Sequence, residues 1–292
     1  MSGLFNDEFL RTAAQLRILA RQVPPGGRHA EQRSQDRGSG LEFRDFRAYV
    51  PGDDLRRVDW NAYRRSGRLF LRLFDEPEDL AVHVLVDVSR SMFHEEPPRA
   101  DPARQLAGLI AAVATGQSDR VTLWPFGDRL GPPRVVVGGQ AELHAGLQYL
   151  EELTTAASTD FASALREFLS RPRRSGLLVI ISDFFDARGT DAVLEALRSV
   201  RDRFVLVQVV RTGDADPPHE GEVALVDCET GSEVEVMVSA ETRRRYQAGY
   251  RAFCDALLAF AARRRAAHVR LDADVPVLAQ IERLFRQRVL EV

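Results

Sequence analysis

Acids and hydroxyls in the first of three loops stand where they could bind a metal ion. This loop follows the apolar run 80–86 and carries Asp87, Ser89 and Ser91 at alternate positions. Side chains spaced in this way could project together as oxygen donors. Sets made only of oxygen suit a hard cation such as Mg²⁺ better than zinc. The alternative reading is a strand end capped by Ser and Asp ahead of the next helix.

Two further loops extend the oxygen set. A second apolar run, 177–181, ends in Ser182 and Asp183, and Thr159 stands directly ahead of an amphipathic helical pattern at 161–169. In parallel sheets, ligands bind beyond the carboxyl ends of the strands. Three separate loops therefore offer an Asp-x-Ser-x-Ser set, a Thr and an Asp.

The elements that must hold these loops alternate between strand and helix from residue 80 onward. We expect strands at 81–87, 121–126, 134–138, 177–182 and 204–210, and helices at 103–117, 140–153, 160–170 and 190–201. Residues 223–227 and 233–238 predict a β-hairpin on the sheet edge, followed by a helix at 240–266, a strand at 268–271 and a helix at 275–288. This alternation predicts an α/β fold with a doubly wound, mostly parallel sheet and helices on both faces.

The residues before position 80 form a separate pattern. Apolar residues recur at helical spacing over 4–22, and residues 68–74 alternate like a half-buried strand. Trp60 stands among charged residues, and we expect its ring to be buried against the main domain. The rival interpretation makes Asp53, Asp54 and Trp60 a second docking surface.

The five metal-site candidates together resemble the metal-ion-dependent adhesion site of von Willebrand factor A domains. Carried over by position, this resemblance implies that Ser89, Ser91 and Thr159 supply hydroxyls. Asp87 and Asp183 would bind the metal directly or through water. The implied cofactor is Mg²⁺ or Mn²⁺.

A second resemblance covers most of the chain. Residues 40–60, GLEFRDFRAYVPGDDLRRVDW, are similar to the signature of a bacterial family called domain of unknown function 58. In that family the segment precedes a von Willebrand A-like domain. The resemblance implies an N-terminal helix, loop and signature segment at 1–79, packed on a von Willebrand A-like domain at 80–292. Relatives commonly carry glycines just before the Thr, so Ser158 could compete with Thr159 for the hydroxyl role.

Composition excludes several kinds of chemistry. The chain has 292 residues, of which 45% are hydrophobic and 28% charged, as in an ordinary globular protein. All 40 basic residues are Arg. Without lysine, a Walker A phosphate loop and Schiff-base catalysis are excluded. The formal charge of −3 gives no general attraction to nucleic acid or an anionic membrane.

Partners and location follow from similar arguments. The Arg residues between 44 and 72 alternate with acids, which favours internal ion pairs over a nucleic-acid surface. The amino terminus lacks the pattern of a signal peptide, and the longest apolar run, 256–262, is too short to span a bilayer. Cys228 and Cys254 have no metal-ligand spacing, which suggests reduced thiols. We therefore expect a soluble cytoplasmic protein.

Two function classes compete. The first is a non-enzymatic adaptor that docks an acidic residue of a partner protein on its metal. The family resemblance implies a MoxR-type AAA+ ATPase as a partner, because such ATPases are often encoded beside family members. The second is a metal-dependent phosphohydrolase of the haloacid dehalogenase type that uses Asp87 as nucleophile. That chemistry normally needs a second acid where this chain has Ser89, and a lysine, so we favour the adaptor.

Overall fold

The structure, a computed structural model, describes residues 3–22, 42–50, 53, 58–75, 80–156 and 158–280. The chain divides into two compact units. One unit combines Met1–Arg21 with Leu80–Val292, and the other is Gln22–Asp79. The first helix thus belongs with the larger unit. Docking of the rest of 1–79 on the main domain stays a prediction.

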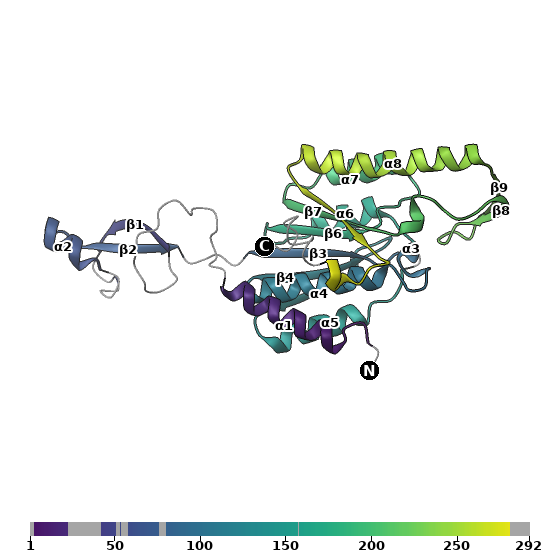
Figure 1. The fold of residues 1–292 in the computed structure, drawn as a ribbon. Coiled ribbons are helices and arrows are strands. Elements are labelled where there is room, and N and C mark those ends of the chain that lie inside the picture. The colour runs from purple at the N-terminus through teal and green to yellow at the C-terminus, as the bar shows by residue number, and fades with distance from the viewer. Residues whose placement is uncertain are drawn as a thin grey trace. The chain divides into compact units, whose positions relative to one another are not determined.

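The larger unit is built on a six-stranded sheet with the order β10-β7-β6-β3-β4-β5 in the described part of the chain (Figure 1). Its strands are β3 (Ala81–Asp87), β4 (Arg120–Phe126), β5 (Arg134–Val137), β6 (Leu177–Ser182), β7 (Arg203–Val210) and β10 (Ala267–Asp272). Neighbouring strands pair in parallel except β5, which runs antiparallel to β4. The direction of strand addition reverses between β3 and β6. Open parallel sheets bind ligands at such a point, beyond the carboxyl ends of the strands.

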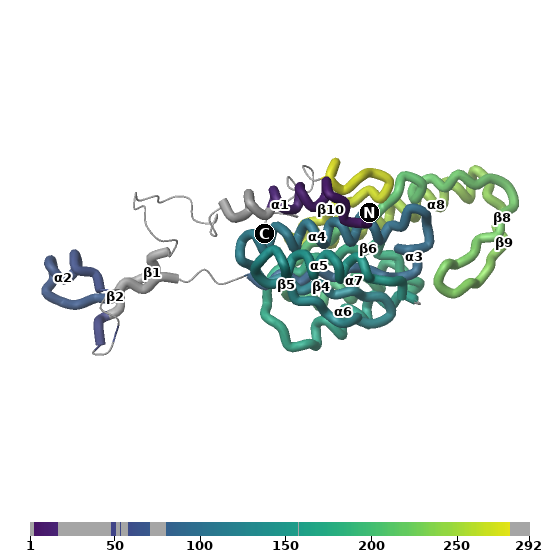
Figure 2. The backbone as a smooth tube through the Cα atoms, turned by 90° about the horizontal axis from the view of Figure 1, so that it is seen from below, coloured from purple at the N-terminus to yellow at the C-terminus, as the bar shows by residue number. Residues whose placement is uncertain are grey.

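Helices cover both faces of this sheet. One face packs against α1 (Asp7–Gln22), α4 (Ala100–Gly116) and α5 (Gln140–Glu151), and the other against α6 (Phe161–Ser170), α7 (Thr190–Arg198) and α8 (Ala240–Arg263). Figure 1 shows α7 and α8 on one side of the sheet, and Figure 2 shows α4 and α5 from the other side. Along β3, Val82, Val84 and Val86 enter the first core while Leu85 enters the second. The predicted doubly wound α/β class is confirmed.

The hairpin departs from its predicted place. Strands β8 (Gly221–Val226) and β9 (Glu233–Val238) pair antiparallel in a two-stranded sheet of their own. The prediction that the hairpin lies on the edge of the main sheet is wrong, because β10 pairs with β7 along its whole length and takes that edge. In the larger unit, the described residues also form two short helical segments that were not predicted: α3 (Arg90–Phe93) and η2 (Thr212–Asp214).

The smaller unit contains an antiparallel pair, β1 (Glu42–Ala48) with β2 (Phe70–Asp75), and the helix α2 (Trp60–Ser66). Asp59 caps α2, since its Oδ1 accepts hydrogen bonds from the backbone N–H of Asn61 (2.8 Å) and Ala62 (2.9 Å). The cap places Trp60 at the first helical position, where its side chain is 55% exposed and meets Tyr63 edge-on. Within its own unit Trp60 is therefore exposed, and its packing against the main domain stays a prediction.

Other predictions fall partly outside the described residues. Most side chains of the Arg- and Asp-rich signature segment lie there, as does the predicted helix 275–288 beyond residue 280. The expected strand at 68–74 is present as β2. Among the described helices, none is both long and apolar enough to cross a membrane.

Candidate metal centre

Two buried acids stand at the point where strand order reverses. Asp87 is the last residue of β3, and Asp183 directly follows β6, the strand beside it. Each is only 1% exposed. Apart from His83, their strands are apolar and buried up to these ends, so the two carboxyl groups leave the core at one edge of the sheet.

Both carboxylate oxygens of Asp87 are held. Oδ1 accepts the backbone N–H of Ser89 (2.8 Å), and Oδ2 accepts the hydroxyl of Ser182 (2.5 Å). The Ser182 hydroxyl also accepts the N–H of Phe184 (2.8 Å), a residue with φ of 60°. Such strained backbone outside glycine persists where the surroundings fix it, often at functional sites. Ser182 was not predicted as a site residue, although its place next to Asp183 was a signal.

The two serine hydroxyls of the first loop lie together, with Oγ of Ser89 and Oγ of Ser91 3.0 Å apart. The Ser91 hydroxyl also faces Asp183 and opposes the rise in the pKa of that acid. Oδ1 of Asp183 accepts the N–H of Phe185 (3.0 Å). Oδ2 of Asp183 is buried and accepts a hydrogen bond from no described residue. A buried carboxylate oxygen without a partner is costly, so it points to a missing ligand.

The pKa shifts of the two site acids also indicate a place for a cation. Burial raises the pKa of Asp183, and the neighbouring charge of Asp87 raises it further. Burial also raises the pKa of Asp87, against the hydrogen bonds from Ser182 and Ser89. Arg99 acts against the rise in the pKa of Asp183, but its guanidinium is already paired, with Glu95 (2.9 Å) and Asp214 (2.5 Å). No described Arg forms an ion pair with either site acid.

Thr159 reaches the site through an acid that the sequence did not single out. Its backbone N–H donates to Oε2 of Glu229 (3.0 Å), and its hydroxyl donates to Oε1 of the same carboxylate. The charge of Glu229 in turn adds to the raised pKa of Asp87. Glu229 stood in the turn of the predicted hairpin, 70 positions from Thr159, so spacing gave no signal for this contact.

Ion pairs and rings fix the loop that carries Thr159. Asp160 caps α6 by accepting the N–H of Ser163 (2.8 Å), and Arg188 joins Asp160 (2.5 Å) to Asp186 (2.9 Å). The next residue, Phe161, contacts rings from two neighbouring segments. Its centroid lies 5.9 Å from that of Phe126, at the end of β4, and 5.7 Å from that of Phe184, after β6. The loops therefore pack on a shared aromatic cluster of Phe126, Phe161 and Phe184.

Gly127 allows two of these loops to approach each other. A Cβ at this position would lie 2.4 Å from the Cβ of Ala156 and 3.0 Å from the carbonyl oxygen of Ser158. The N–H of Asp160 donates to the Gly127 carbonyl (3.2 Å), which ties the Thr159 loop to the end of β4. A side chain here would push the Thr159 loop out of place.

The donor set fits a hard cation. The structure brings Asp87, Ser89, Ser91 and Asp183 together, and Thr159 binds Glu229, whose charge helps to raise the pKa of Asp87. In the described ranges, no group of three or more His, Cys, Asp or Glu side chains is arranged to hold a metal. An ion at this edge would thus need the hydroxyls as ligands, which is the chemistry of Mg²⁺ rather than zinc. The role of the five residues as ligands stays a prediction.

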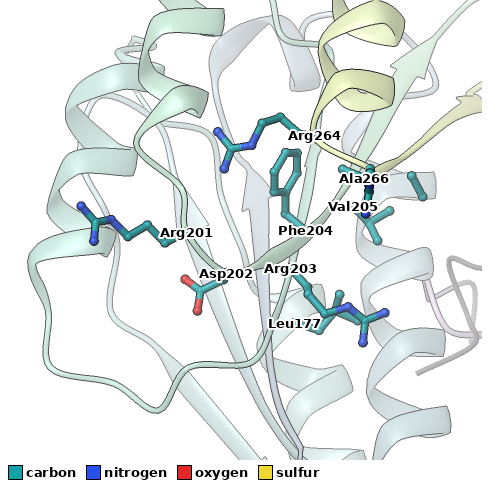
Figure 3. A pocket seen from close by; sticks show the side chains of 10 residues that line it. Leu177, Arg201, Asp202, Arg203, Phe204, Val205, Arg264 and Ala266 are labelled. Atoms are coloured by element: carbon teal, nitrogen blue, oxygen red, sulfur yellow. The ribbon is translucent and has the colours of Figure 1, made fainter. Parts of the chain in front are cut away.

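A pocket of about 350 Å³ lies at the opposite, amino edge of the sheet (Figure 3). One of its arginines, Arg264, is occupied in structural contacts. The Arg264 guanidinium donates to the carbonyls of Arg198 (3.2 Å) and Val200 and lies over the ring of Phe204, 5.6 Å from its centroid. None of the predicted site residues lines this pocket.

Solved structures with a similar chain path were found at low similarity. A conserved hypothetical protein BatB from Bacteroides thetaiotaomicron is 16% identical with a TM-score of 0.44, over 73% of this chain and 98% of that one. An aerotolerance-related membrane protein from Bacteroides fragilis is 15% identical with a TM-score of 0.41, over 73% and 96%. The mussel proximal thread matrix protein 1, with a zinc-occupied MIDAS motif, is 12% identical with a TM-score of 0.36, over 45% and 36%. Each TM-score is below 0.5, so none of these likenesses bears on the chemistry of this chain.

Sequence relatives give a firmer result. Uncharacterized proteins of Mycobacterium bovis and Mycobacterium tuberculosis are 29% identical over 239 residues, which cover 79% of this chain and 74% of theirs. Residues 45–253, well over half of the chain, match the family described as "Protein of unknown function DUF58", and the chain belongs to that family.

Proposed function

We propose that this protein is a non-enzymatic interaction module that holds one Mg²⁺ or Mn²⁺ ion and docks an acidic residue of a partner protein on it. The ligands would be Asp87, Ser89, Ser91, Thr159 and Asp183. The observation that carries the proposal is Oδ2 of Asp183, a buried oxygen without a described hydrogen-bond partner beside a second buried carboxylate. A cation would satisfy that oxygen and offset the repulsion between the two acids.

The chemistry of the ligands favours docking. Hydroxyls of Ser and Thr are neutral, so they bind a cation without cancelling its charge. Once bound, the ion would therefore attract an anionic ligand from outside, and a carboxylate is the natural one in a protein. Ser182, Arg188 and the aromatic cluster would hold the hydroxyls and the two acids in place.

The surroundings of the site suit a protein partner. A pocket of about 310 Å³ lies next along the chain from Asp183 and is lined by aromatic residues of the β6–α7 loop and of α8. Phe185 is 41% exposed there and stacks on Phe253, with centroids 5.1 Å apart. Exposed aromatic rings are enriched in protein interfaces, where they supply much of the binding energy. A partner could place an acid on the metal and an apolar side chain in this pocket.

The hydrolase alternative fits less well. Its nucleophile would be Asp87, which is buried and accepts hydrogen bonds from Ser89 and Ser182. The position two residues later is Ser89 rather than an acid, and all 40 basic residues are Arg. We expect no hydrolysis of phosphate esters or nucleotides above a buffer control. Turnover that disappears in Asp87→Asn would favour the hydrolase instead.

Metal binding tests the proposal directly. Calorimetric titration with Mn²⁺ should show one site in the wild type and none in Asp87→Ala. The matched control is Asp128→Ala, which removes an exposed acid from the loop after β4 and should bind Mn²⁺ like the wild type. Circular dichroism should show that all three proteins fold. Equal binding by the wild type and Asp87→Ala would refute the proposed site.

The partner can be tested separately. The family resemblance implies a MoxR-type AAA+ ATPase, so we include that class of partner in the proposal. A pull-down with such an ATPase from the same genome should succeed in Mg²⁺ and fail in EDTA or with Asp87→Ala. Binding that is unchanged by EDTA would show that the metal does not form the docking surface.

A further inference from the structure

The β8–β9 hairpin is an arm with little core of its own. Its apolar side chains Leu225, Val226, Val234 and Met237 are about half exposed or more. A two-stranded hairpin without a covered apolar face is marginally stable by itself. The contacts at its tip therefore matter for where it lies. In Figure 1 the hairpin is found at the same end of the sheet as α3, which begins in the first site loop.

The tip presents Glu229 in a fixed direction. Oδ1 of Asp227 accepts the N–H of Glu229 (2.8 Å) and the N–H of Thr230 (2.9 Å). The turn closes at Gly231, whose φ of 71° suits a residue without a Cβ and whose N–H donates to the Asp227 carbonyl (2.8 Å). Side-chain acceptors of this kind make a turn rigid. The turn itself thus fixes the orientation of Glu229, independently of its contacts with Thr159.

The tip rests on two of the three site loops. Both oxygens of Glu229 accept hydrogen bonds from Thr159, one from its N–H (3.0 Å) and one from its hydroxyl. Nη1 of Arg90, which lies between Ser89 and Ser91, donates to the carbonyl of Cys228 (3.1 Å). A single turn of the chain therefore spans the Asp-x-Ser-x-Ser loop and the Thr loop.

This contact brings a third carboxylate onto the loop of Thr159, one of the five proposed ligands. Like charges brought together at a protein edge are unfavourable unless a cation lies among them. The unpartnered Oδ2 of Asp183 independently marks the place where a ligand is missing. The Thr159 hydroxyl donates its proton to Glu229, so its lone pairs remain available for a cation.

We infer that Glu229 is the site's own anionic ligand, which would bind the metal at the position that a partner's acid must take. The inference rests on the proposed metal site and identifies how docking at that site is regulated. The hairpin closes the site when no partner is present. A partner acid has to displace Glu229, so its apparent affinity is reduced in proportion to the fraction of molecules that are open.

The test uses the full chain, Mn²⁺ alone as the probe, and a matched pair of variants. Glu229→Gln removes the proposed ligand charge, and Glu235→Gln removes one exposed charge from β9 of the same hairpin. Glu229→Gln should weaken Mn²⁺ binding by about tenfold or more, as expected when a charged ligand is lost, and Glu235→Gln should not. Water proton relaxation should show more exchangeable water on the Mn²⁺ bound to Glu229→Gln than on the wild-type ion.

Displacement gives a second readout. Acetate, added as a carboxylate probe to the Mn²⁺-loaded proteins, should displace metal-bound water at a lower concentration in Glu229→Ala than in the wild type. If both Glu229 variants match Glu235→Gln in Mn²⁺ affinity, bound water and acetate response, the inference is wrong while the metal site stands. If the wild type binds no Mn²⁺ at all, the proposed site itself fails, and the inference falls with it.

Discussion

The pKa values of acids at the two edges of the main sheet are shifted in opposite directions. At the amino edge, Asp202 accepts hydrogen bonds from Nη2 of Arg173 (2.6 Å) and from the Ser175 hydroxyl (2.7 Å). Burial pushes the pKa of Asp202 upward, but these two donors outweigh it and hold the pKa below its usual range. At the carboxyl edge, burial and mutual repulsion instead raise the pKa of Asp87 and Asp183.

This comparison indicates that Asp87 and Asp183 lack an arginine partner because of their role in the site. The chain has 40 Arg residues, and one of them pairs Asp202 where the role of the acid is structural. Arg99 lowers the pKa of Asp183, but its guanidinium is paired with Asp214. Acids left without a counter-charge weaken a fold. We therefore interpret the carboxyl edge as prepared for a cation from solution.

Removing the paired acid should have the largest effect on stability. Asp202→Ala leaves Arg173 with a largely buried, uncompensated charge and should cost about 3–5 kcal/mol of unfolding free energy. Urea denaturation measures the loss. Asp255→Ala, which removes an exposed acid from α8, is the control and should change little. A loss below about 1 kcal/mol in Asp202→Ala would show that the amino-edge pair is not structural.

Removing an acid from the other edge should act in the opposite direction. Asp183→Asn keeps an oxygen for the N–H of Phe185 but deletes a buried charge that repels Asp87. In EDTA at pH 8 the variant should be more stable than the wild type, by on the order of 2 kcal/mol, since one pKa unit corresponds to about 1.4 kcal/mol. Urea denaturation in EDTA measures the difference. Destabilisation would contradict the view that this acid is unpaired.

The pH dependence should also differ in sign. Asp87 and Asp183 have raised pKa values in the fold, so without metal their contribution to stability is full below the ordinary carboxyl pKa of about 4 and is lost as pH rises through the raised values. The lowered pKa of Asp202 gives stability above about pH 4 that is lost as pH falls through the lowered value. Melts in EDTA should show a decline from about pH 4 to 7 that is smaller in Asp183→Asn. An equal decline in both proteins would assign it to other groups.

Much of this comparison was readable from the sequence, because buried parallel strands leave long apolar runs. The runs ending at Asp87 and Asp183 predicted β3 and β6, and with them the edge where the two acids meet. The smaller unit was read less well. Charged residues mask the periodicity of β1, and the short helix that begins at Trp60 was not predicted.

Contacts between distant loops were beyond prediction. Glu229 looks like any polar turn residue, and only the folded hairpin shows that it meets Thr159. Ser182 was visible beside Asp183, but β-strand alternation gave no reason to aim its hydroxyl at Asp87. The place of the hairpin itself was misjudged because β10, the last strand of the main sheet, competes for the same edge.

The smallest predicted effect concerns the hydroxyl of Ser182. Ser182→Ala removes a donor to Asp87 and the acceptor for the N–H of Phe184. It should cost about 1 kcal/mol, and more at pH 8 than at pH 5, because the hydrogen bond favours the charged form of Asp87. Urea titrations at the two pH values measure this. A loss that does not depend on pH would mean that Ser182 supports only the backbone of the strand end.

The central claim is that a cation supplies the charge that the carboxyl edge lacks, and thermal melts with and without Mg²⁺ test it most directly. In EDTA, Asp183→Asn should melt above the wild type. With Mg²⁺ at about 100 times its dissociation constant, the wild type should gain about 2.7 kcal/mol, whereas Asp183→Asn should gain little or nothing. A wild type that melts at the same temperature in Mg²⁺ and in EDTA, or a variant that responds equally, would contradict the account.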